Sequence, residues 1–572
     1  MNGHRTQPRA RRLCCAAVAI VLAASVAIAA AAGTVRAAQE EDPYRLEELA
    51  QLPLDVEILK ERADEGIRIV ELKYTSEVYH GEPVRIYGIY AAPAEPTGQV
   101  PAILWGQAGL YQASDYFPVL LAKRGYGCLC IDAPFRGYRS TGVAGYDVWH
   151  IANPISDHSA VRIARAFHRG VSYLVSRPEI DPERIGAAGS SWGGYAVLLT
   201  AGLDERIKVV STFFGSGNLH LGSAWLGEIM KNRGPDLERW RQLYDPAARL
   251  PARKDLAVMI TTGTNDQFYK VPAVSQTYLD TLGDRRLGWI PHYNHALTER
   301  GDEMVFEFID HHLRPGAGVP FNEVADASVA ARGGKLMVTF TCRGQREAAE
   351  ASVHFSYGLA GNWEARLWDK AMAKLVDEKW EAEVPVLRPE LPLAWYAEVT
   401  DTTGAFIGTD VRMATPKDLG IVGATAQASG ADGCFYGDFE AEDMVYLQRS
   451  GQPVAPADTA VAHTGKQSLR LEAKDGDLSF STDYVRWCPA FDGDLTAWLR
   501  GTGGEVELAL GGAVDGRPVG YSVKTTTGEQ WQKVGIRFPA CKPEESGVLH
   551  WTIHVPAGQT VWLDTLRFRL VP

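Results

Sequence analysis

Cysteine is scarce in this sequence: the 572 residues include 8 cysteines, and no two of them form a Cys-x-x-Cys pair. Zinc sites built on thiolates use such closely spaced pairs, so the spacing argues against metal chemistry through sulfur. Cys128 and Cys130 lie two residues apart in an apolar, strand-like run, which predicts two buried thiols on one face. Cys434, Cys488 and Cys541 share the C-terminal region, where the sequence allows one disulfide without determining its pairing.

Positive charge is the minority sign, because 58 Lys and Arg residues stand against 70 Asp and Glu residues, for a net charge of −12. Nucleic acid and anionic membrane surfaces both repel an acidic protein. After residue 37 the sequence also lacks any apolar run long enough to span a bilayer. We therefore expect no nucleic-acid partner and no membrane association of the mature chain.

The one long apolar run, Leu13–Ala32, follows four arginines and precedes Val35-Arg36-Ala37. A basic start, an apolar middle and small residues before the cut make up a secretory signal peptide, so residues 1–37 are expected to be removed on export. A retained membrane anchor is the alternative, because the run is nearly long enough to cross a bilayer. Cleavage removes five arginines and no acidic residue, which leaves 53 basic and 70 acidic residues, or −17, on a periplasmic or secreted protein.

A chain of this length exceeds what one hydrophobic core serves, so two to four domains are expected. Residues 38–315 are predicted to form an α/β domain, a mostly parallel sheet with helices on both faces, because apolar runs alternate there with helix-length amphipathic stretches. The expected strands are Val84–Ala92, Ala102–Trp105, Gly127–Ile131, Arg184–Ala188, Val209–Phe214, Ala257–Thr262 and Leu287–Ile290, and the expected helices are Ser156–Ser176, Gly194–Gly202 and Ala273–Leu282.

The periodicity changes after Pro315-Gly316 to alternating strands without helix-length partners. This pattern predicts two all-β sandwich domains. The first is an Ig-like β-sandwich at residues 316–419, and the second covers residues 434–572. A stretch rich in Gly, Ala and Ser at residues 420–433 is interpreted as the linker between them.

The run Gly189-Ser190-Ser191-Trp192-Gly193 follows an expected strand and precedes an expected helix. Gly-x-Ser-x-Gly in this setting makes a nucleophile elbow, a turn so tight that glycines flank the serine and the hydroxyl projects above the sheet. The helix dipole then favours negative charge as it develops at the serine. Ser191 is therefore the predicted nucleophile.

An elbow of this type calls for an acid and then a histidine further along the chain. Asp266 follows the expected strand Ala257–Thr262 and is the predicted orienting acid, with a turn-forming Asp as the alternative. His295 precedes the closing helix and is the predicted base, while His292 competes with it three residues earlier. His311 and His312 fall within that helix and are expected to be surface or packing residues.

Two backbone N–H groups are predicted to hold the oxyanion: that of Trp192, which follows the nucleophile, and that of Gln107, in the turn after an early strand. A plain glycine-rich turn is the alternative for Gln107. Trp105 and Trp225 are the predicted substrate-binding residues. Trp225 belongs to an insertion at residues 217–250, which forms either a lid or helical packing over the sheet.

Together, Gly189–Gly194, Gly263-Thr264-Asn265-Asp266, Asn294-His295-Ala296-Leu297 and Asp132-Ala133-Pro134-Phe135-Arg136-Gly137 resemble one branch of the α/β-hydrolases. That branch includes the prolyl-oligopeptidase-like hydrolases, the acetyl xylan esterases and the PhoPQ-regulated hydrolases. The resemblance covers about residues 66–314 and implies a Ser-Asp-His triad without a cofactor or a catalytic metal. The early strand ends His-Gly-Tyr in acetyl xylan esterases and Trp105-Gly106-Gln107 here, so the substrate does not carry over. Arg136 is expected to hold loops together.

Four motifs occur in this order in the C-terminal segment: Gly437–Glu440, His463–Arg470, Trp531–Val534 and Val561–Asp564. This succession is similar to carbohydrate-binding modules of the galactose-binding, jelly-roll type. The resemblance implies a jelly-roll, galactose-binding-like domain at residues 434–572. Such modules often hold a structural calcium ion, so calcium in this domain is a prediction that the resemblance implies. Glu440, Lys466 and Asp564 match the corresponding regions loosely.

These features favour an exported serine hydrolase that cleaves carboxylic esters through an acyl-enzyme, with an acyl group on carbohydrate as the expected target. The predicted partner is thus a small-molecule or polysaccharide ester, and the sequence does not determine the oligomeric state. A serine peptidase of the prolyl-oligopeptidase type is the alternative, although about 30 residues before the first strands leave no room for a propeller. A non-catalytic binding protein on a hydrolase scaffold is the third hypothesis.

Overall fold

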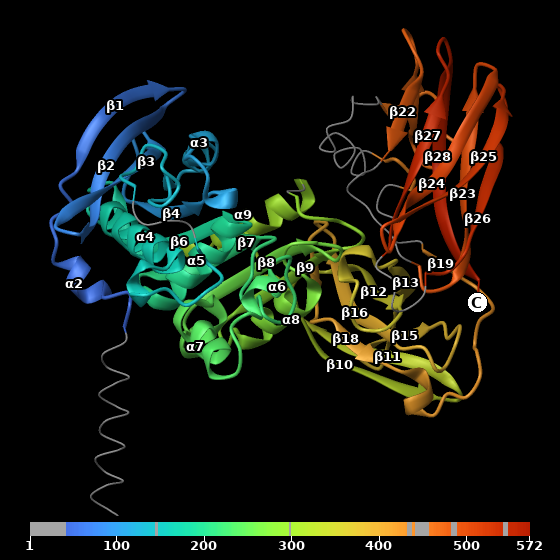
Figure 1. Ribbon diagram of the computed structural model, residues 1–572, viewed down its shortest axis with the longest axis horizontal. Coiled ribbons are helices and arrows are strands. Elements are labelled where there is room, and N and C mark those ends of the chain that lie inside the picture. Colours follow the sequence, from blue (N-terminus) through green and yellow to red (C-terminus); the bar gives the residue numbers. More distant parts are fainter. Residues whose placement is uncertain are drawn as a thin grey trace, which may run out of the picture.

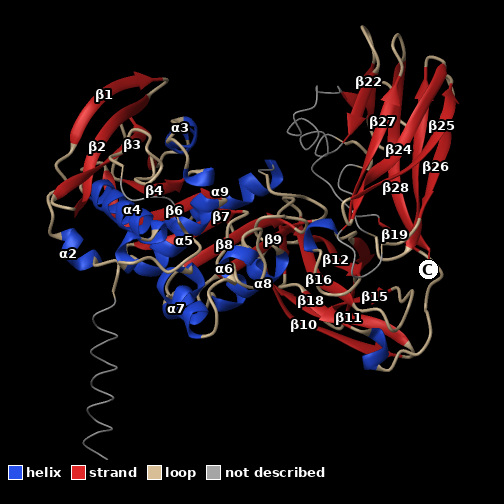
Figure 2. Ribbon diagram, viewed as in Figure 1, coloured by secondary structure: helices blue, strands red, loops and turns tan. Residues whose placement is uncertain are grey.

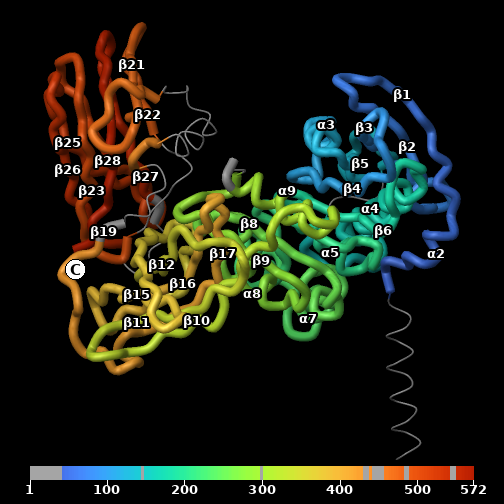
Figure 3. Tube along the Cα trace, turned by 180° about the vertical axis from the view of Figure 1, so that it is seen from behind, coloured from blue at the N-terminus to red at the C-terminus, as the bar shows by residue number. Residues whose placement is uncertain are grey.

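The structure is a computed structural model that describes residues 42–142, 147–296, 299–431, 437–440, 457–481, 489–541 and 547–571. In this part of the chain an α/β unit is followed by two units made of strands (Figures 1 and 2). The middle unit lies between the other two, as the view from behind also shows (Figure 3). The predicted signal peptide, residues 1–37, and the two cysteines Cys434 and Cys488 fall outside the described residues.

The first unit contains a nine-stranded sheet in the order β1-β2-β3-β5-β4-β6-β7-β8-β9. Strands β5, β4, β6, β7, β8 and β9 pair in parallel, whereas β1, β2 and β3 form an antiparallel edge. This arrangement is that of an α/β-hydrolase and confirms the predicted fold class. The strands are β1 (Glu57–Asp64), β2 (Ile67–Tyr79), β3 (Glu82–Pro93), β4 (Val100–Gly106), β5 (Gly127–Ile131), β6 (Ile180–Ser190), β7 (Ile207–Phe213), β8 (Ala257–Gly263) and β9 (Arg285–Ile290).

Helices cover both faces of this sheet. On one face lie α3 (Tyr116–Lys123) and α9 (Glu299–Leu313), and on the other α4 (Ser159–Val175), α5 (Trp192–Leu203) and α8 (Val271–Asp280). Because neighbouring residues of a strand point to opposite faces, β4 places Ile103 in the first core and Leu104 in the second. Burial on both sides explains why the central strands are continuous apolar runs in the sequence.

Several elements of this unit were not among the predicted ones. The edge strands β1 and β2 lack the continuous apolar character of the central strands, and β1 is exposed along most of its length. The helix α3 has eight residues and was also not predicted. The insertion between β7 and β8 carries two helices, α6 (Leu226–Ile229) and α7 (Pro235–Tyr244). A small helix, α2 (Leu46–Ala50), precedes the sheet and packs against α4.

The middle unit is a pair of antiparallel sheets, as expected from its alternating sequence. One sheet has the order β10-β11-β15-β14 and the other the order β13-β12-β16-β17, with β18 also paired to β16. Their bounds are β10 (Glu323–Arg332), β11 (Lys335–Arg343), β12 (Ala348–Tyr357), β13 (Asp369–Met372), β14 (Lys374–Val376), β15 (Lys379–Val384), β16 (Leu393–Asp401), β17 (Phe406–Gly408) and β18 (Arg412–Ala414).

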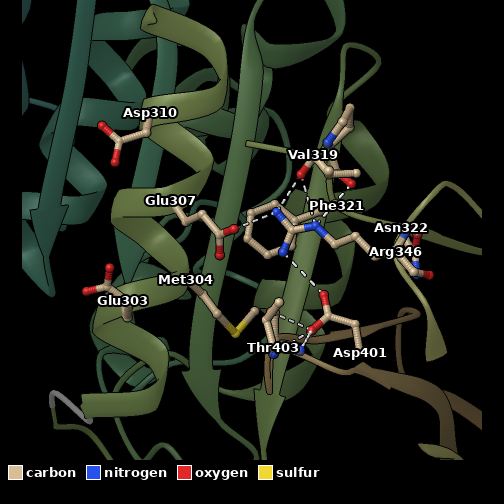
Figure 4. A network of polar contacts seen from close by, with 12 residues as sticks. Glu303, Met304, Glu307, Asp310, Val319, Phe321, Asn322, Arg346, Asp401 and Thr403 are labelled. Atoms are coloured by element: carbon tan, nitrogen blue, oxygen red, sulfur yellow. Dashed lines mark hydrogen bonds and ion pairs between the residues drawn. The ribbon is translucent and has the colours of Figure 1, made fainter. Parts of the chain in front are cut away.

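The middle unit packs directly on the last strand of the hydrolase sheet. β17 lies against β9, and the Trp289 indole of β9 donates a 2.9 Å hydrogen bond to the carbonyl oxygen of Thr409. Figure 4 shows a second contact, in which the guanidinium of Arg346 lies over the ring of Phe321 and bonds Glu307 of α9 at 2.7 Å and Asp401 of β16 at 3.2 Å. The hydrolase sheet therefore ends against a buried wall of the sandwich.

The C-terminal unit is a second pair of antiparallel sheets. Their orders are β20-β21-β28-β23-β26, with β19 also paired to β28, and β22-β27-β24-β25. Part of the predicted linker is regular structure, because residues 429–431 form β19 and pair with β28. The strands are β19 (Ser429–Ala431), β20 (Ala457–Asp458), β21 (Ser468–Glu472), β22 (Leu478–Ser481), β23 (Asp492–Gly501), β24 (Gly504–Val514), β25 (Arg517–Thr527), β26 (Gln532–Phe538), β27 (Gly547–Val555) and β28 (Thr560–Val571).

Candidate active site

Ser191 occupies a strained turn between β6 and α5. Its φ is 56° and its ψ is −124°, a conformation that L-residues other than glycine rarely adopt. Its N–H donates a 3.0 Å hydrogen bond to the carbonyl oxygen of Phe213 at the end of β7, which fixes the turn to the sheet. A side chain on Gly193 would overlap the backbone of Gly106, so glycine is required where the helix meets β4.

The side chains of Ser191, His295 and Asp266 form a continuous chain of hydrogen bonds. Ser191 Oγ lies 2.8 Å from His295 Nε2, and His295 Nδ1 lies 2.7 Å from Asp266 Oδ2. Asp266 follows β8 and His295 follows β9, so all three residues stand at the carboxyl ends of parallel strands. Ligands of open α/β sheets bind at this edge.

The carboxylate of Asp266 is held by its own loop. Its Oδ1 accepts hydrogen bonds from the N–H groups of Phe268 and Tyr269, at 2.7 and 2.9 Å, and its Oδ2 also receives the Thr262 hydroxyl at 3.3 Å. Asp266 is 1% exposed. Asp266 therefore has both predicted roles: its Oδ1 stabilises the turn, and its Oδ2 faces His295.

The structure places the two competing histidines differently. His292 is fully buried at φ 60°, and its Nε2 accepts a 2.8 Å hydrogen bond from the N–H of Trp368 in the middle unit. His295, three residues later, reaches Ser191 and packs between the rings of Phe214 and Phe268. Of the two histidines in α9, His312 lies 3.1 Å from the carboxylate of Asp284.

The loop after β4 lies beside the elbow. Gly106 pairs with Gly189 of β6, so Gln107 follows at the level of the nucleophile. The Gln107 side chain accepts a 3.2 Å hydrogen bond from the Trp105 indole, and Arg136 donates a 2.6 Å hydrogen bond to the carbonyl oxygen of Gly109. Arg136 thus holds this loop, as expected from its turn.

Trp105 has a different place from the predicted one. Its ring is fully buried and stacks on Phe117 of α3 at 3.6 Å between centroids, so it offers no surface to a substrate. The prediction of substrate contact was wrong because the last residues of β4, like the rest of this central strand, are covered on both faces. Trp105 instead orients Gln107 through its indole N–H.

An aromatic wall of Trp149, Trp192, Trp225 and Phe268 stands next to His295. Trp225 lies 4.7 Å from Trp192, 5.2 Å from Trp149 and 5.6 Å from Phe268, measured between ring centroids, and Phe268 lies 4.8 Å from His295. Trp225 and Trp149 remain partly exposed. The insertion thus carries Trp225 to the predicted site. Trp149, in the loop between β5 and α4, was not predicted because one tryptophan in an irregular loop carries no periodic signal.

The middle unit contacts both loops that carry the acid and the histidine. Asn265, beside Asp266, donates a 2.8 Å hydrogen bond to the carbonyl oxygen of Arg366, and Lys270 pairs with Glu364 at 3.1 Å. His292 is bound to the same segment through Trp368. We call residues 362–368 the clasp. Nothing in the sequence indicated it, because the contact joins residues about 100 positions apart.

Cys128 and Cys130 of β5 are fully buried, and burial raises the pKa of the Cys130 thiol to about 12, which keeps it protonated. Glu440 accepts a hydrogen bond from the N–H of Lys466, and Asp564 accepts those of His463 and Thr464. The described residues contain no group of three or more His, Cys, Asp or Glu side chains arranged for a metal, so calcium stays a prediction.

A membrane-spanning helix is not found in the part of the chain that the structure describes. The prediction of a cleaved signal peptide concerns residues outside that part.

Comparison with known proteins supports a hydrolase. The profile of the prolyl oligopeptidase family matches residues 115–285, which contain Ser191 and Asp266. A putative hydrolase of Bacillus subtilis (strain 168), YtaP, is 28% identical over 145 residues, covering 21% of this chain and 45% of the relative. The thiohydrolase apmlB of Arthrinium phaeospermum is 28% identical over 110 residues, covering 18% and 36%. The chain thus spans less than half the length of these curated relatives.

Among solved structures, an acetyl xylan esterase from Paenibacillus sp. R4 aligns with 47% of this chain and 92% of its own, at 19% identity and a TM-score of 0.37. A second acetyl xylan esterase, from Thermoanaerobacterium sp. JW/SL YS485, aligns with 46% of this chain and 90% of its own, at 19% identity and a TM-score of 0.38. The strand order and pairing of the sheet are those of an α/β-hydrolase, and the family match over residues 115–285 supports a hydrolase.

Proposed function

We propose that the protein is an exported serine hydrolase that cleaves carboxylic esters, with an acyl group on carbohydrate as substrate. The hydrogen-bond chain from Ser191 through His295 to Asp266 carries the proposal. It is the arrangement that activates a serine hydroxyl, since one imidazole nitrogen accepts the hydroxyl proton while the carboxylate keeps the other nitrogen protonated.

In the proposed reaction Ser191 Oγ attacks the ester carbonyl carbon while its proton passes to His295 Nε2. The resulting oxyanion accepts hydrogen bonds from the N–H groups of Trp192 and Gln107. Collapse breaks the bond to the alcohol, which leaves with the proton from His295, and an acyl group remains on Ser191. Water then repeats the sequence on the acyl-enzyme and releases the acid.

Labelling with a fluorophosphonate tests the nucleophile. The wild-type protein is expected to take up one label, Ser191→Ala none, and Ser190→Ala, which removes the adjacent serine of the same turn, as much as the wild type. Ser191→Ala is also expected to lower kcat by about 10⁴- to 10⁶-fold, because triad residues act as a unit. Uptake of label by Ser191→Ala would refute the assignment.

The substrate class is tested on a panel of nitrophenyl acetate, acetylated xylan and Xaa-Pro amides. The match to the prolyl oligopeptidase family favours a peptidase as the second candidate function. Turnover of both esters without the amides supports the esterase, and turnover confined to the amides would replace it by the peptidase. Mass spectrometry of the exported protein tests the signal peptide, with Ala38 as the expected first residue.

A further inference from the structure

A groove of about 820 Å³ runs over one face of the C-terminal unit, far along the chain from the triad. It lies across β23, β26 and β28, which are adjacent in one sheet (Figure 1). This volume is in the range of pockets that hold small ligands or short polymer segments. Its walls include Asp494, Thr496, Trp498, Lys533, Gly535, Arg537, Arg567 and Arg569.

The pairing of the three strands explains why these residues share a face. Asp494 of β23 stands opposite Arg537 of β26 and Arg569 of β28, and Trp498 stands opposite Lys533. The intervening β23 residues, Leu495, Ala497 and Leu499, are fully buried, because alternate residues of a strand point to opposite faces. The polar row is thus the outer face of a sheet whose inner face is core.

Gly535 leaves the centre of this face open. It stands opposite Thr496 and supplies no side chain between the longer ones of Lys533 and Arg537 on the same strand. The groove therefore has a floor of backbone and small side chains, and the long cationic side chains form its sides.

The groove is cationic although the protein as a whole is acidic. Four of its residues are Lys or Arg and one is acidic, in a chain of net charge −12. Arg537 pairs with Asp494 at 3.2 Å and Arg567 with Asp438 at 2.6 Å. Within the described residues Lys533 and Arg569 are exposed and have no ion-pair partner, so their charge is available to a ligand.

These cations lie at both ends of the groove: Arg537 and Arg569 flank Asp494, and Lys533 stands beside Trp498. Lys533 and Arg537 are four residues apart on one strand, which separates them by about 13 Å. An extended chain of negative charges that runs along β26 can contact both at once. The Trp498 indole, backed by the His463 imidazole at 3.9 Å, lies at the Lys533 end and offers an apolar surface of the kind on which a sugar ring packs.

We propose that this groove binds an anionic polysaccharide. Cations at both ends of the groove fit a polymer with repeated acidic groups, and the aromatic surface beside Lys533 fits sugar rings. The net negative charge of the rest of the protein disfavours a nucleic acid or an anionic membrane, which present charge over a much larger surface. The proposal does not depend on the reaction catalysed at Ser191.

Binding is tested with the full mature chain by titration against polygalacturonate, which carries carboxylates, and dextran sulfate, which carries sulfates. We expect binding of at least one of them that weakens as salt is added, because exposed charges are screened. The polymer that binds with the higher affinity identifies whether the groove prefers carboxylates or sulfates. Absence of binding to both at low salt would overturn the proposal, as would equal or tighter binding of double-stranded DNA or phosphatidylserine vesicles.

The double variant Lys533→Gln/Arg569→Gln is expected to weaken the binding about tenfold, since each exposed contact between opposite charges contributes a few-fold. Lys474→Gln/Lys524→Gln removes two exposed charges outside the groove and is the matched control, with an expected change within about twofold. An equal loss in both variants would show general charge attraction and overturn the site. Hydrolysis of nitrophenyl acetate should be unchanged in all variants, so this test is separate from that of the proposed function.

Discussion

The substitution Asp266→Asn tests how the loop after β8 fixes the protonation of His295. In the native side chain Oδ1 accepts the N–H groups of Phe268 and Tyr269, and Oδ2 faces His295 Nδ1. An asparagine keeps its carbonyl oxygen toward those two N–H groups, because the reversed amide would set donor against donor. Its NH₂ group then faces His295 Nδ1, which must become an acceptor.

That change places the proton of neutral His295 on Nε2, the atom 2.8 Å from Ser191 Oγ. The imidazole then donates to the serine and cannot take its proton. The expected loss in kcat is about 10⁴-fold, the size seen for this tautomer error in a serine protease, or about 5.4 kcal/mol of transition-state stabilisation.

The assay is kcat/KM on nitrophenyl acetate, with circular dichroism and thermal unfolding to show that the variant folds. Asp255→Asn, at an exposed position before β8 paired with Arg253, is the matched control and should retain activity. If Asp266→Asn kept more than about 1% of the wild-type activity, the amide orientation and the role of Asp266 would both be wrong.

Three further predictions concern packing and pH. His292→Leu leaves the buried N–H of Trp368 without its acceptor and should lower the free energy of unfolding by about 1–3 kcal/mol and reduce kcat, with His311→Gln as control; unchanged values in urea titrations and kinetics would refute the role of the clasp. Arg346→Met leaves the carboxylates of Glu307 and Asp401 unpaired and should cost about 3 kcal/mol by the same titration, whereas a gain in stability would show that the ion pairs do not hold the two units together. Burial lowers the pKa of His158 to about 3, against about 6.5 when unfolded, so only the unfolded chain gains this proton as pH falls from 6.5 toward 3, and stability should decrease by up to about 1.4 kcal/mol per pH unit. His158→Asn retains an N-cap for α4 and should flatten this dependence in unfolding curves at pH 5 and 7; an unchanged slope would contradict it.

The sequence was sufficient for the parts of the fold that depend on local pattern. The central strands are long apolar runs because both of their faces are buried, and the elbow is recognisable because tight packing against Gly106 requires glycine at Gly193. The sequence was insufficient where the role of a residue depends on its exposure and on its neighbours in the fold. Both Trp105 and Trp225 are tryptophans, yet Trp105 is buried at the end of β4 and Trp225 reaches the site from an insertion.

The sequence did not distinguish His292 from His295, because the contact that separates them joins distant parts of the chain. Both histidines follow β9 within one loop, and either spacing is compatible with a histidine that swings back to Ser191. What separates them is a partner about 76 positions away, the N–H of Trp368, which engages His292 and leaves His295 directed at the serine.

The clasp extends the support of the catalytic loops from the α/β sheet into the middle unit. The acid loop is bound through Asn265 and Lys270, and the histidine loop through His292, all to residues 362–368 of the middle sandwich. Both loops must keep their hydrogen bonds to within a few tenths of an ångström. They are thus supported by the middle sandwich, which the sequence predicts as a domain separate from the hydrolase sheet. Misplacement of a catalytic group by about 1 Å costs about 100-fold in rate. We therefore expect contacts outside the α/β sheet to affect activity as directly as contacts within it.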